Sequence, residues 1–395
     1  MAMSGHCRSR SRGSRAALVV CVLVCAALLS VPLAGCGIGV KEAPQAPDVS
    51  GLSITVWDAA QPRVEGVADY RQAATRVAAE FAGRCGLNVD LRFVARQQIA
   101  DLLLGKTAGE RPHLVFTTEW PFAPLDLPGV PELVDEASYL DAAASYWKRD
   151  GRILAIPSYI HWIGLVSRGD APVGTEALRQ ETAYFADSPA FLRLALDSPG
   201  AGWDAEKVAS YLAWVKETYG PPPVDPLAAW DEETVQAIFP VTAYLLRWLR
   251  ERRGELLRLL PLAGPFGEPG FYYTVPGYVV LAAEEPYRSC AADLGRELAA
   301  NLGRWAARAV GAIPAAVSDL AVFNVESGLS FEERSALIRS VSTCRSRVPA
   351  TDDYLYRESV VSAVRQDAWD FLSGKTTEAE ARRSIREALE RYTRP

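Results

Sequence analysis

Between residues 52 and 118, short apolar runs typical of strands alternate with segments that have the hydrophobic spacing of helices. Residues 52–57, 87–94 and 111–118 are short apolar runs of the kind that form β-strands. Residues 70–85 repeat apolar side chains every three to four positions, which predicts an amphipathic helix, and residues 95–106 predict a second helix. The order strand, helix, strand, helix, strand is typical of a βαβαβ unit with a parallel sheet. Ligands of such sheets bind beyond the carboxyl ends of the strands.

The remaining chain mixes extended and helical patterns. Asp150-Gly151 predicts a hairpin turn, and the following residues 153–168 predict a long extended stretch that Pro157 interrupts. Residues 261–286 predict a loop that leads into a strand. Helices are predicted over residues 204–220, 231–260 and 291–310 and at the C-terminus, where Thr376 or Thr377 would cap the last helix.

The N-terminal residues have the pattern of a targeting segment. Four arginines within the first fifteen residues precede an apolar run over 16–35, and this basic-then-apolar order is typical of a signal peptide. A transmembrane anchor is the alternative, because a run of this length can span a bilayer. The sequence Leu-Ala-Gly-Cys that ends at Cys36 resembles the bacterial lipobox, which favours a lipoprotein signal. We therefore expect lipidation of Cys36 and a lipid-anchored protein on the extracytoplasmic face of the cell membrane.

Charge and cysteine content narrow the classes of function. Without the four N-terminal arginines, 38 basic residues face 48 acidic ones, which is a net charge of about −10. Such an acidic chain is a poor candidate for binding nucleic acid. Cys290 and Cys344 could form a disulfide and leave Cys85 free, or all three could be unpaired thiols. No Cys/His spacing, P-loop, GxGxxG or GxSxG sequence is present, so we predict neither a metal nor another cofactor.

Several segments in this order resemble one protein family. The segments span residues 54–57, 109–122, 146–168, 276–298 and 354–392, and the last contains a Gly-Lys-Thr-x-x-Glu-Ala pattern before the final helix. Together they resemble the family-1 extracellular solute-binding proteins of ABC importers, the class that includes maltose-binding proteins. One departure is in the region 235–260, which lacks the Phe-x-x-Gly-x-x-Ala-Met segment that this family usually carries in its second lobe.

The resemblance implies an α/β protein with a two-lobed, type II periplasmic-binding-protein-like fold. Each lobe would be a mixed sheet flanked by helices, and crossing segments would join the lobes as a hinge. The expected organisation is a signal peptide over 1–35, a tether over 36–50, the first lobe over 51–156 and 276–318, and the second lobe over 157–275 and 319–395.

Aromatic residues and carboxylates at predicted strand ends form the candidate ligand site. Sugars present apolar ring faces and a rim of hydroxyls, so a site for them needs aromatic surfaces and polar groups. Trp120 and Trp162 are placed at the cleft by the resemblance, and Tyr354 and Tyr356 precede a helix that would begin there. The complete candidate set is Trp57, Asp58, Glu119, Trp120, Tyr159, Trp162, Tyr272, Tyr273, Tyr354 and Tyr356.

Each candidate residue also has a structural explanation. Tryptophan and tyrosine are commonly half-buried with only the polar tip in water. Asp58 could cap the segment that follows it. The tryptophans Trp203, Trp214, Trp248, Trp305 and Trp369 lie within helical patterns, where a core position is expected.

The function implied is capture of a small neutral solute, such as a sugar or oligosaccharide, by a monomer that delivers it to the transmembrane subunits of an ABC permease. No bond would be made or broken, so the chain would not be an enzyme. An exported carbohydrate-active hydrolase is the main alternative, with Asp58 and Glu119 as its two carboxylates. A degenerate homologue that acts as a sensor or scaffold is another alternative, because the second-lobe signature is missing.

Overall fold

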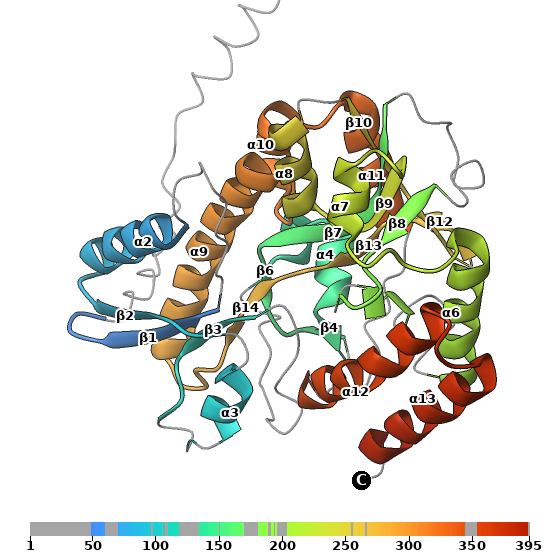
Figure 1. Ribbon diagram of the computed structural model, residues 1–395. Coiled ribbons are helices and arrows are strands. Elements are labelled where there is room, and N and C mark those ends of the chain that lie inside the picture. The colour runs from blue at the N-terminus through green and yellow to red at the C-terminus, as the bar shows by residue number, and fades with distance from the viewer. Residues whose placement is uncertain are drawn as a thin grey trace, which may run out of the picture. The chain divides into compact units, whose positions relative to one another are not determined.

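The computed structural model describes residues 49–59, 70–95, 98–104, 106, 110–117, 134–149, 151–169, 181–188, 191–192, 194–195, 204–253, 256–264, 267–343 and 354–393. Residues from Val49 onward form one compact unit. Within the described part of the chain, two mixed sheets are flanked by helices (Figure 1). This arrangement agrees with the α/β fold class expected from the sequence. The predicted lobe boundaries stay a prediction.

The first sheet contains the βαβαβ unit. Strands β1 and β2 are parallel with Ser53 opposite Asn88, and β1 is also parallel to β3 with Val56 opposite Leu114. This pairing confirms the predicted parallel core. Strand β14 returns to the sheet antiparallel to β3, and β6 pairs with its other edge. The strands in spatial order are β2 (Asn88–Phe93), β1 (Ser53–Asp58), β3 (Leu114–Thr117), β14 (Gly277–Val280) and β6 (Ile156–Pro157).

Helices α2 (Tyr70–Cys85) and α9 (Tyr287–Val310) pack against this sheet and against each other (Figure 1). The buried face of α2 consists of Tyr70, Ala74, Ala78 and Phe81, which is the three-to-four spacing of an amphipathic helix. Helix α9 contacts β1, β3, β14 and β6 and extends to the second sheet. A single continuous helix therefore packs against both sheets.

The second sheet is organised around one long strand, β7 (Tyr159–Arg168). Nine of its ten residues are buried, as expected for a strand covered on both faces. Different antiparallel strands pair with different parts of β7. Pro314 pairs with Tyr159 at one end of β7, and Leu257 pairs with Arg168 at the other end. The other strands are β8 (Thr182–Tyr184), β9 (Ala237–Thr242), β10 (Leu257–Leu260), β13 (Tyr272–Thr274) and β15 (Ile313–Pro314).

Two of the crossings between the sheets are joined by hydrogen bonds. The chain passes from β6 to β7 through Ser158 and returns from β13 to β14 through residues 275–276. The backbone N–H of Ser158 and its hydroxyl both donate to the Pro276 carbonyl oxygen, at 2.9 and 2.7 Å. Gly303 of α9 lies so close that a Cβ there would be 2.5 Å from the Ser158 carbonyl oxygen. Only glycine allows the helix to approach the crossing this closely.

Residues 231–260 are not one helix. They form the end of a short helix, then β9, then helix α8 and β10, so the helical prediction is wrong for β9 and β10. Strand β9 contains the apolar run Ala-Ile-Phe-Pro-Val-Thr, and five of its six residues are buried. These residues form a strand because they pair with β7 and β8. The sequence does not reveal this pairing, because the neighbouring residues have helical periodicity.

The C-terminal helices pack beside the second sheet. A hydrophobic cluster joins strands of that sheet to α6, α12 and α13, with Tyr184, Leu212, Phe239, Leu372 and Ile385 among its members. Tyr354 and Tyr356 were expected to precede a helix, whereas they lie in the first turn of α12. The helices of this cluster are α6 (Ala205–Tyr219), α12 (Tyr354–Leu372) and α13 (Glu378–Thr393), whereas α7 (Pro226–Asp231) and α8 (Ala243–Arg253) contact the second sheet and belong to the main core.

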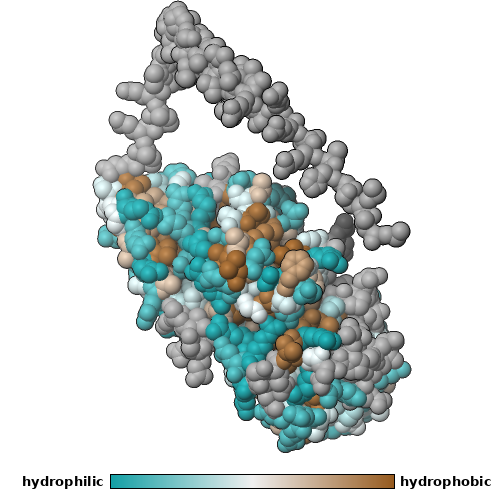
Figure 2. Space-filling model, turned by 90° about the horizontal axis from the view of Figure 1, so that it is seen from above, coloured by the Kyte–Doolittle hydropathy of each residue, from teal (hydrophilic) through white to brown (hydrophobic). Residues whose placement is uncertain are grey.

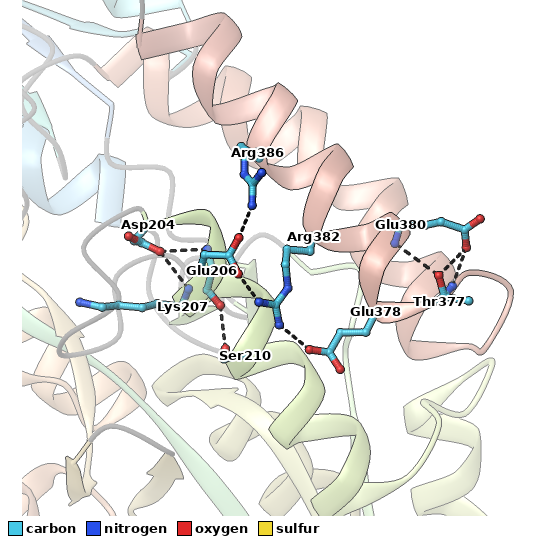
Figure 3. A network of polar contacts seen from close by, with 9 residues as sticks. All are labelled: Asp204, Glu206, Lys207, Ser210, Thr377, Glu378, Glu380, Arg382 and Arg386. Atoms are coloured by element: carbon cyan, nitrogen blue, oxygen red, sulfur yellow. Dashed lines mark hydrogen bonds and ion pairs between the residues drawn. The ribbon is translucent and has the colours of Figure 1, made fainter.

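Glu206 links α6 to α13 (Figure 3). Its carboxylate accepts hydrogen bonds from the guanidinium groups of Arg382 and Arg386, and Arg382 also bonds to Glu378 within its own helix. The hydrogen bond from Arg386 and that from Arg382 lower the pKa of Glu206. Because these side chains are largely exposed, the network orients α13 rather than supplying much stability.

Both helices begin with side-chain caps (Figure 3). Asp204 accepts from the backbone N–H groups of Glu206 and Lys207 at 2.9 and 3.1 Å. The Thr377 hydroxyl oxygen accepts from the Glu380 N–H, and the Glu380 carboxylate accepts from the Thr377 N–H at 2.8 Å. This reciprocal capping box confirms Thr377 as the N-cap of the last helix.

Shorter elements complete the described fold. The hairpin β4–β5 brackets Gly151, whose φ of 77° is the left-handed geometry that a tight turn needs. The remaining elements are α3 (Ile99–Leu104), η3 (Glu136–Ser138), α4 (Asp141–Tyr146), β4 (Lys148–Arg149), β5 (Arg152–Ile153), β11 (Leu262–Gly264), β12 (Gly267–Gly270), η4 (Val317–Asp319), α10 (Leu320–Glu326) and α11 (Phe331–Thr343).

The exposed surface is mainly polar with separate apolar side chains. Leu256, Val325 and Phe331 are the large exposed hydrophobic residues near β10, α10 and α11. Figure 1 draws these elements at the top, and Figure 2, which is seen from above, shows apolar residues interspersed among hydrophilic ones. Among the described helices, none combines the length and the apolar character that crossing a bilayer requires.

Candidate ligand-binding site

Asp58 ends β1 at the carboxyl edge of the first sheet and is completely buried. Its Oδ2 atom accepts hydrogen bonds from the hydroxyls of Tyr70, at 2.9 Å, and Tyr278, at 2.8 Å. The two hydroxyl oxygens are 2.7 Å apart. We call these three residues the Asp58 cluster. It joins β1, the first turn of α2 and the returning strand β14.

Burial and charge keep the tyrosines of the Asp58 cluster protonated. Burial raises the pKa of Tyr70 and of Tyr278 well above the ordinary value, and the negative charge of Asp58 raises both further. A neutral phenol can donate its hydrogen to the carboxylate, and such charge-assisted hydrogen bonds are stronger than neutral ones. The cluster therefore combines one carboxylate with two neutral phenols at the end of β1.

Aromatic rings surround the cluster. The Phe116 ring lies 4.9 Å from that of Tyr278, and the Trp305 ring lies 5.8 Å from that of Tyr70. Trp57 is also buried, with 5% of its surface exposed. In this structure Trp57 and Asp58 belong to the core below the sheet edge. Ligand contact by either one stays a prediction.

Tyr159 and Trp162 lie on the strand that enters the second sheet. Tyr159 is buried and hydrogen-bonds with Tyr244 of α8, whose pKa is raised by burial and then by Tyr159. Trp162 is entirely buried, and its indole N–H donates to the Gly311 carbonyl oxygen at 2.9 Å. The structure gives Trp162 a packing role, and its contact with ligand stays untested.

Tyr272 and Tyr273 occupy opposite faces of β13. Tyr273 is buried in the main core, whereas Tyr272 is only partly buried and packs against the cluster that contains α6 and α13. Both pair with β7, with Tyr273 opposite Trp162. Tyr272 is the more exposed of the two, and ligand contact by either one stays a prediction.

Several predicted residues lie outside the described part of the chain. Glu119 and Trp120 follow β3 in the segment 118–133, and the segment 60–69 follows β1. The side chains of Tyr354 and Tyr356 are also outside it, as are Cys36 and Cys344.

Cys290 is a free thiol, as is Cys85. Cys344 lies outside the described residues, so both alternatives, a Cys290–Cys344 disulfide and three unpaired thiols, stay predictions. In the described residues, no group of three or more His, Cys, Asp or Glu side chains is arranged to hold a metal ion.

Tyr70, Tyr278 and Tyr244 were missed by reasoning from sequence. Tyr70 opens the first amphipathic helix and Tyr278 follows Gly277 in the returning strand. A signal for Tyr278 was present, since a strand was predicted within residues 261–286, which contain the Gly-Tyr-Val-Val sequence of β14. Their meeting at Asp58 joins residues 220 positions apart, which local patterns cannot reveal.

Comparisons with solved structures identify the fold. The chain matches the maltose-maltodextrin binding protein of Alicyclobacillus acidocaldarius with a TM-score of 0.59 and 15% identity, covering 86% of this chain and 100% of that one. It matches the cyclic alpha-maltosyl-1,6-maltose binding protein from Arthrobacter globiformis with a TM-score of 0.65 and 12% identity, covering 87% and 99%. It matches the GacH receptor of Streptomyces glaucescens, determined unliganded and with acarbose, with a TM-score of 0.60 and 15% identity, covering 87% and 98%.

These similarities confirm the type II periplasmic-binding-protein-like fold over most of the chain. No protein-family model matches the sequence. No curated protein sequence matches it either. The identities are low enough that the likeness establishes the fold alone.

Proposed function

We propose that this chain is the solute-binding component of an ABC importer. It captures a small neutral sugar or oligosaccharide between its two lobes and delivers it to the transmembrane permease subunits. The observation that carries the proposal is the match, over 86–87% of the chain, to solved proteins named for maltodextrins, a cyclic maltosyl-maltose and acarbose. The acidic net charge favours a neutral solute over an anion.

A hydrolase is disfavoured by the surroundings of Asp58. A catalytic carboxylate must reach the scissile bond or a water molecule beside it. Asp58 is fully enclosed and already accepts two phenol hydrogen bonds. The pair Asp58 and Glu119 therefore does not support an exported carbohydrate-active enzyme.

A sensor or scaffold without sugar binding is the second candidate function. One observation favours it: Trp57, Asp58, Tyr159, Trp162 and Tyr273 are all buried within the protein. In that case the binding-protein fold would be kept while the ligand contacts were lost. The titration described next separates the two functions.

Titration with neutral oligosaccharides tests the proposal. Maltose, maltotriose, maltotetraose and α-cyclodextrin are added while tryptophan fluorescence is recorded, and the sugar is recovered afterwards. We expect saturable binding of at least one sugar, which is recovered unchanged. Trp120→Ala should weaken that binding roughly tenfold or more, as expected for an aromatic anchor. Trp248→Ala, which removes a ring on α8, is the matched control and should leave the affinity unchanged.

The outcomes of this titration are distinct. Conversion of the sugar to shorter products supports the hydrolase. No response to any sugar supports the scaffold. Unchanged affinity in Trp120→Ala shows that the site is not where the sequence places it.

Membrane anchoring is proposed to depend on Cys36. The diacylglycerol is attached to the thiol, and serine cannot replace it in that reaction. Cys36→Ser should move the protein out of the membrane fraction. It should then be found in the soluble extracytoplasmic fraction or in a cell-associated fraction as uncleaved precursor, as measured by immunoblotting of fractionated cells. An unaltered membrane fraction that resists salt and alkali points instead to a transmembrane anchor formed by the apolar run.

A further inference from the structure

His113 binds strand β1 through both its backbone and its side chain. Its backbone N–H donates to the Thr55 carbonyl oxygen at 2.9 Å, as in a parallel ladder. In the opposite direction, the Thr55 N–H donates to the Nδ1 atom of the His113 ring, also at 2.9 Å. His113 directly precedes β3. An imidazole nitrogen therefore accepts a hydrogen bond from the backbone of β1 at the point where β3 begins.

These two hydrogen bonds close one end of a short junction in the first sheet. Strand β1 pairs with β2 over six positions but with β3 over only three. In the spatial order β2, β1, β3, β14 and β6, the β1–β3 junction joins the first two strands to the rest of the sheet. The Asp58 cluster ties β1 to β14 at the carboxyl end of the junction, and His113 ties β1 to β3 at the other end.

Neighbouring groups hold the His113 ring in position. The ring stacks on that of Tyr287 at the start of α9, with centroids 4.9 Å apart and an interplanar angle of 11°. The His113 carbonyl oxygen accepts from the N–H groups of Leu281 and Ala282, at 2.9 and 3.3 Å. The backbone of His113 and the plane of its ring are therefore both fixed.

The hydrogen bond from Thr55 requires an Nδ1 atom without a proton. A neutral imidazole has one nitrogen that accepts, whereas the imidazolium ion carries donors at both nitrogens. A proton on Nδ1 would place one N–H group against another. A half-turn of the ring within the same stack would present a C–H group instead, so the hydrogen bond is lost in either case.

We propose that His113 is an acid-sensitive clamp on β1: protonation of its ring breaks the bond from Thr55 and loosens the junction between β1 and β3. At neutral pH the neutral ring holds this end of the junction closed. On acidification the Thr55 N–H loses its acceptor within the sheet, and loss of a partner by a backbone donor is costly.

The direction of the pH dependence follows from burial of the ring. Burial lowers the pKa of His113, so the folded protein favours the neutral ring. The resulting contribution to stability is complete above the ordinary histidine pKa of about 6.5. It is lost as the pH falls through the lower pKa of the folded protein.

Other ionisable residues on the surrounding elements separate from this effect by their position. They are Asp58 on β1, Glu284, Glu285, Tyr287 and Arg288 around the start of α9, and Glu110 and Arg111 before β3. Glu110, Glu284 and Glu285 are exposed, so solvent screens their charges. Asp58 lies at the opposite end of the junction, where it is bound by two phenols.

Titration of His113 in the folded, full chain tests the proposal. His161→Asn leaves His113 as the one histidine among the described residues. NMR of the imidazole C–H signals follows its ionisation from about pH 4.5 to about pH 8, in the folded protein and in urea. We expect the His113 midpoint to lie at lower pH in the folded protein than in the unfolded chain.

Two variants separate the clamp from other effects of acid. His113→Asn keeps an acceptor oxygen but cannot titrate, and His113→Phe keeps a ring on Tyr287 but has no acceptor. Between about pH 7.5 and about pH 5, the melting temperature of the parent should fall roughly 2–4 °C further than that of either variant. His161→Asn is the matched control and should keep the larger fall of the parent.

Hydrogen exchange locates the change within the molecule. Amides in peptides that cover residues 52–58 should exchange roughly tenfold faster at about pH 5 than at about pH 7.5 in the parent, after correction for the intrinsic effect of pH. This acceleration should be absent in His113→Asn. Amides of α13, which belongs to the other hydrophobic cluster, should keep their protection.

Three results would overturn the proposal. Equal midpoints of His113 in the folded and unfolded chain show that the bond from Thr55 does not keep the ring neutral. An equal fall of the melting temperature in the parent and in His113→Asn shows that other groups govern the response to acid. Unchanged exchange of residues 52–58 in the parent shows that β1 is not released. The first and third results come from chains that retain His113, so they stand even where a His113 variant fails to fold.

Discussion

Replacing Trp162 by alanine should lower the free energy of unfolding by about 3–5 kcal/mol. The side chain is fully buried on β7 of the second sheet, and its loss leaves a cavity in the main core. It also removes the hydrogen bond to Gly311 and the edge-to-face contact with Phe271, whose ring centroid is 6.4 Å away. Chemical denaturation monitored by far-UV circular dichroism measures the loss.

Trp248→Ala is the matched control for this experiment. Trp248 is only partly buried and lies 4.8 Å from the Arg252 guanidinium carbon. Its replacement should cost about 1 kcal/mol, which is typical of a partly exposed cation–π pair. Equal losses in the two variants would show that Trp162 is not a core residue.

Replacing Asp58 by alanine should cost about 2–4 kcal/mol. The carboxylate accepts hydrogen bonds from Tyr70 and Tyr278, and both hydroxyls are buried. After its removal one hydroxyl can still donate to the other, because their oxygens are 2.7 Å apart. One buried donor therefore remains unsatisfied. Urea denaturation of the variant and the parent protein measures the difference.

Asn and a neighbouring aspartate provide the controls for Asp58. Asp58→Asn keeps an acceptor oxygen, so its cost should be smaller, about 1–2 kcal/mol. Asp90 lies on the adjacent strand β2 with 41% of its side chain exposed, and Asp90→Ala should change stability by less than about 0.5 kcal/mol. If Asp58→Ala and Asp90→Ala behave alike, the Asp58 cluster does not stabilise the fold.

Local patterns predicted the elements whose structure depends on near neighbours. The helix expected over 70–85 is observed as Tyr70–Cys85, because its apolar spacing and the following Gly86 both act locally. Thr377 was one of two expected caps, and its capping box needs only residues within one turn. The βαβαβ order likewise led to a parallel sheet with the expected strands.

The parts that failed depend on long-range pairing. Strand β9 has the composition of either a helix or a buried strand, and only its partners β7 and β8 decide between them. Asp58 was correctly placed at a strand end, but the sequence did not show that Tyr70 and Tyr278 would enclose it.

We expect the chain to bind a neutral sugar without altering it. Isothermal titration calorimetry of the protein with maltose, maltotriose, maltotetraose and α-cyclodextrin measures this binding. We expect one site per chain for at least one sugar, and a ligand at a hundred times its Kd should stabilise the folded protein by about 2.7 kcal/mol. Absence of heat and of thermal stabilisation at millimolar concentrations of every sugar would contradict the account.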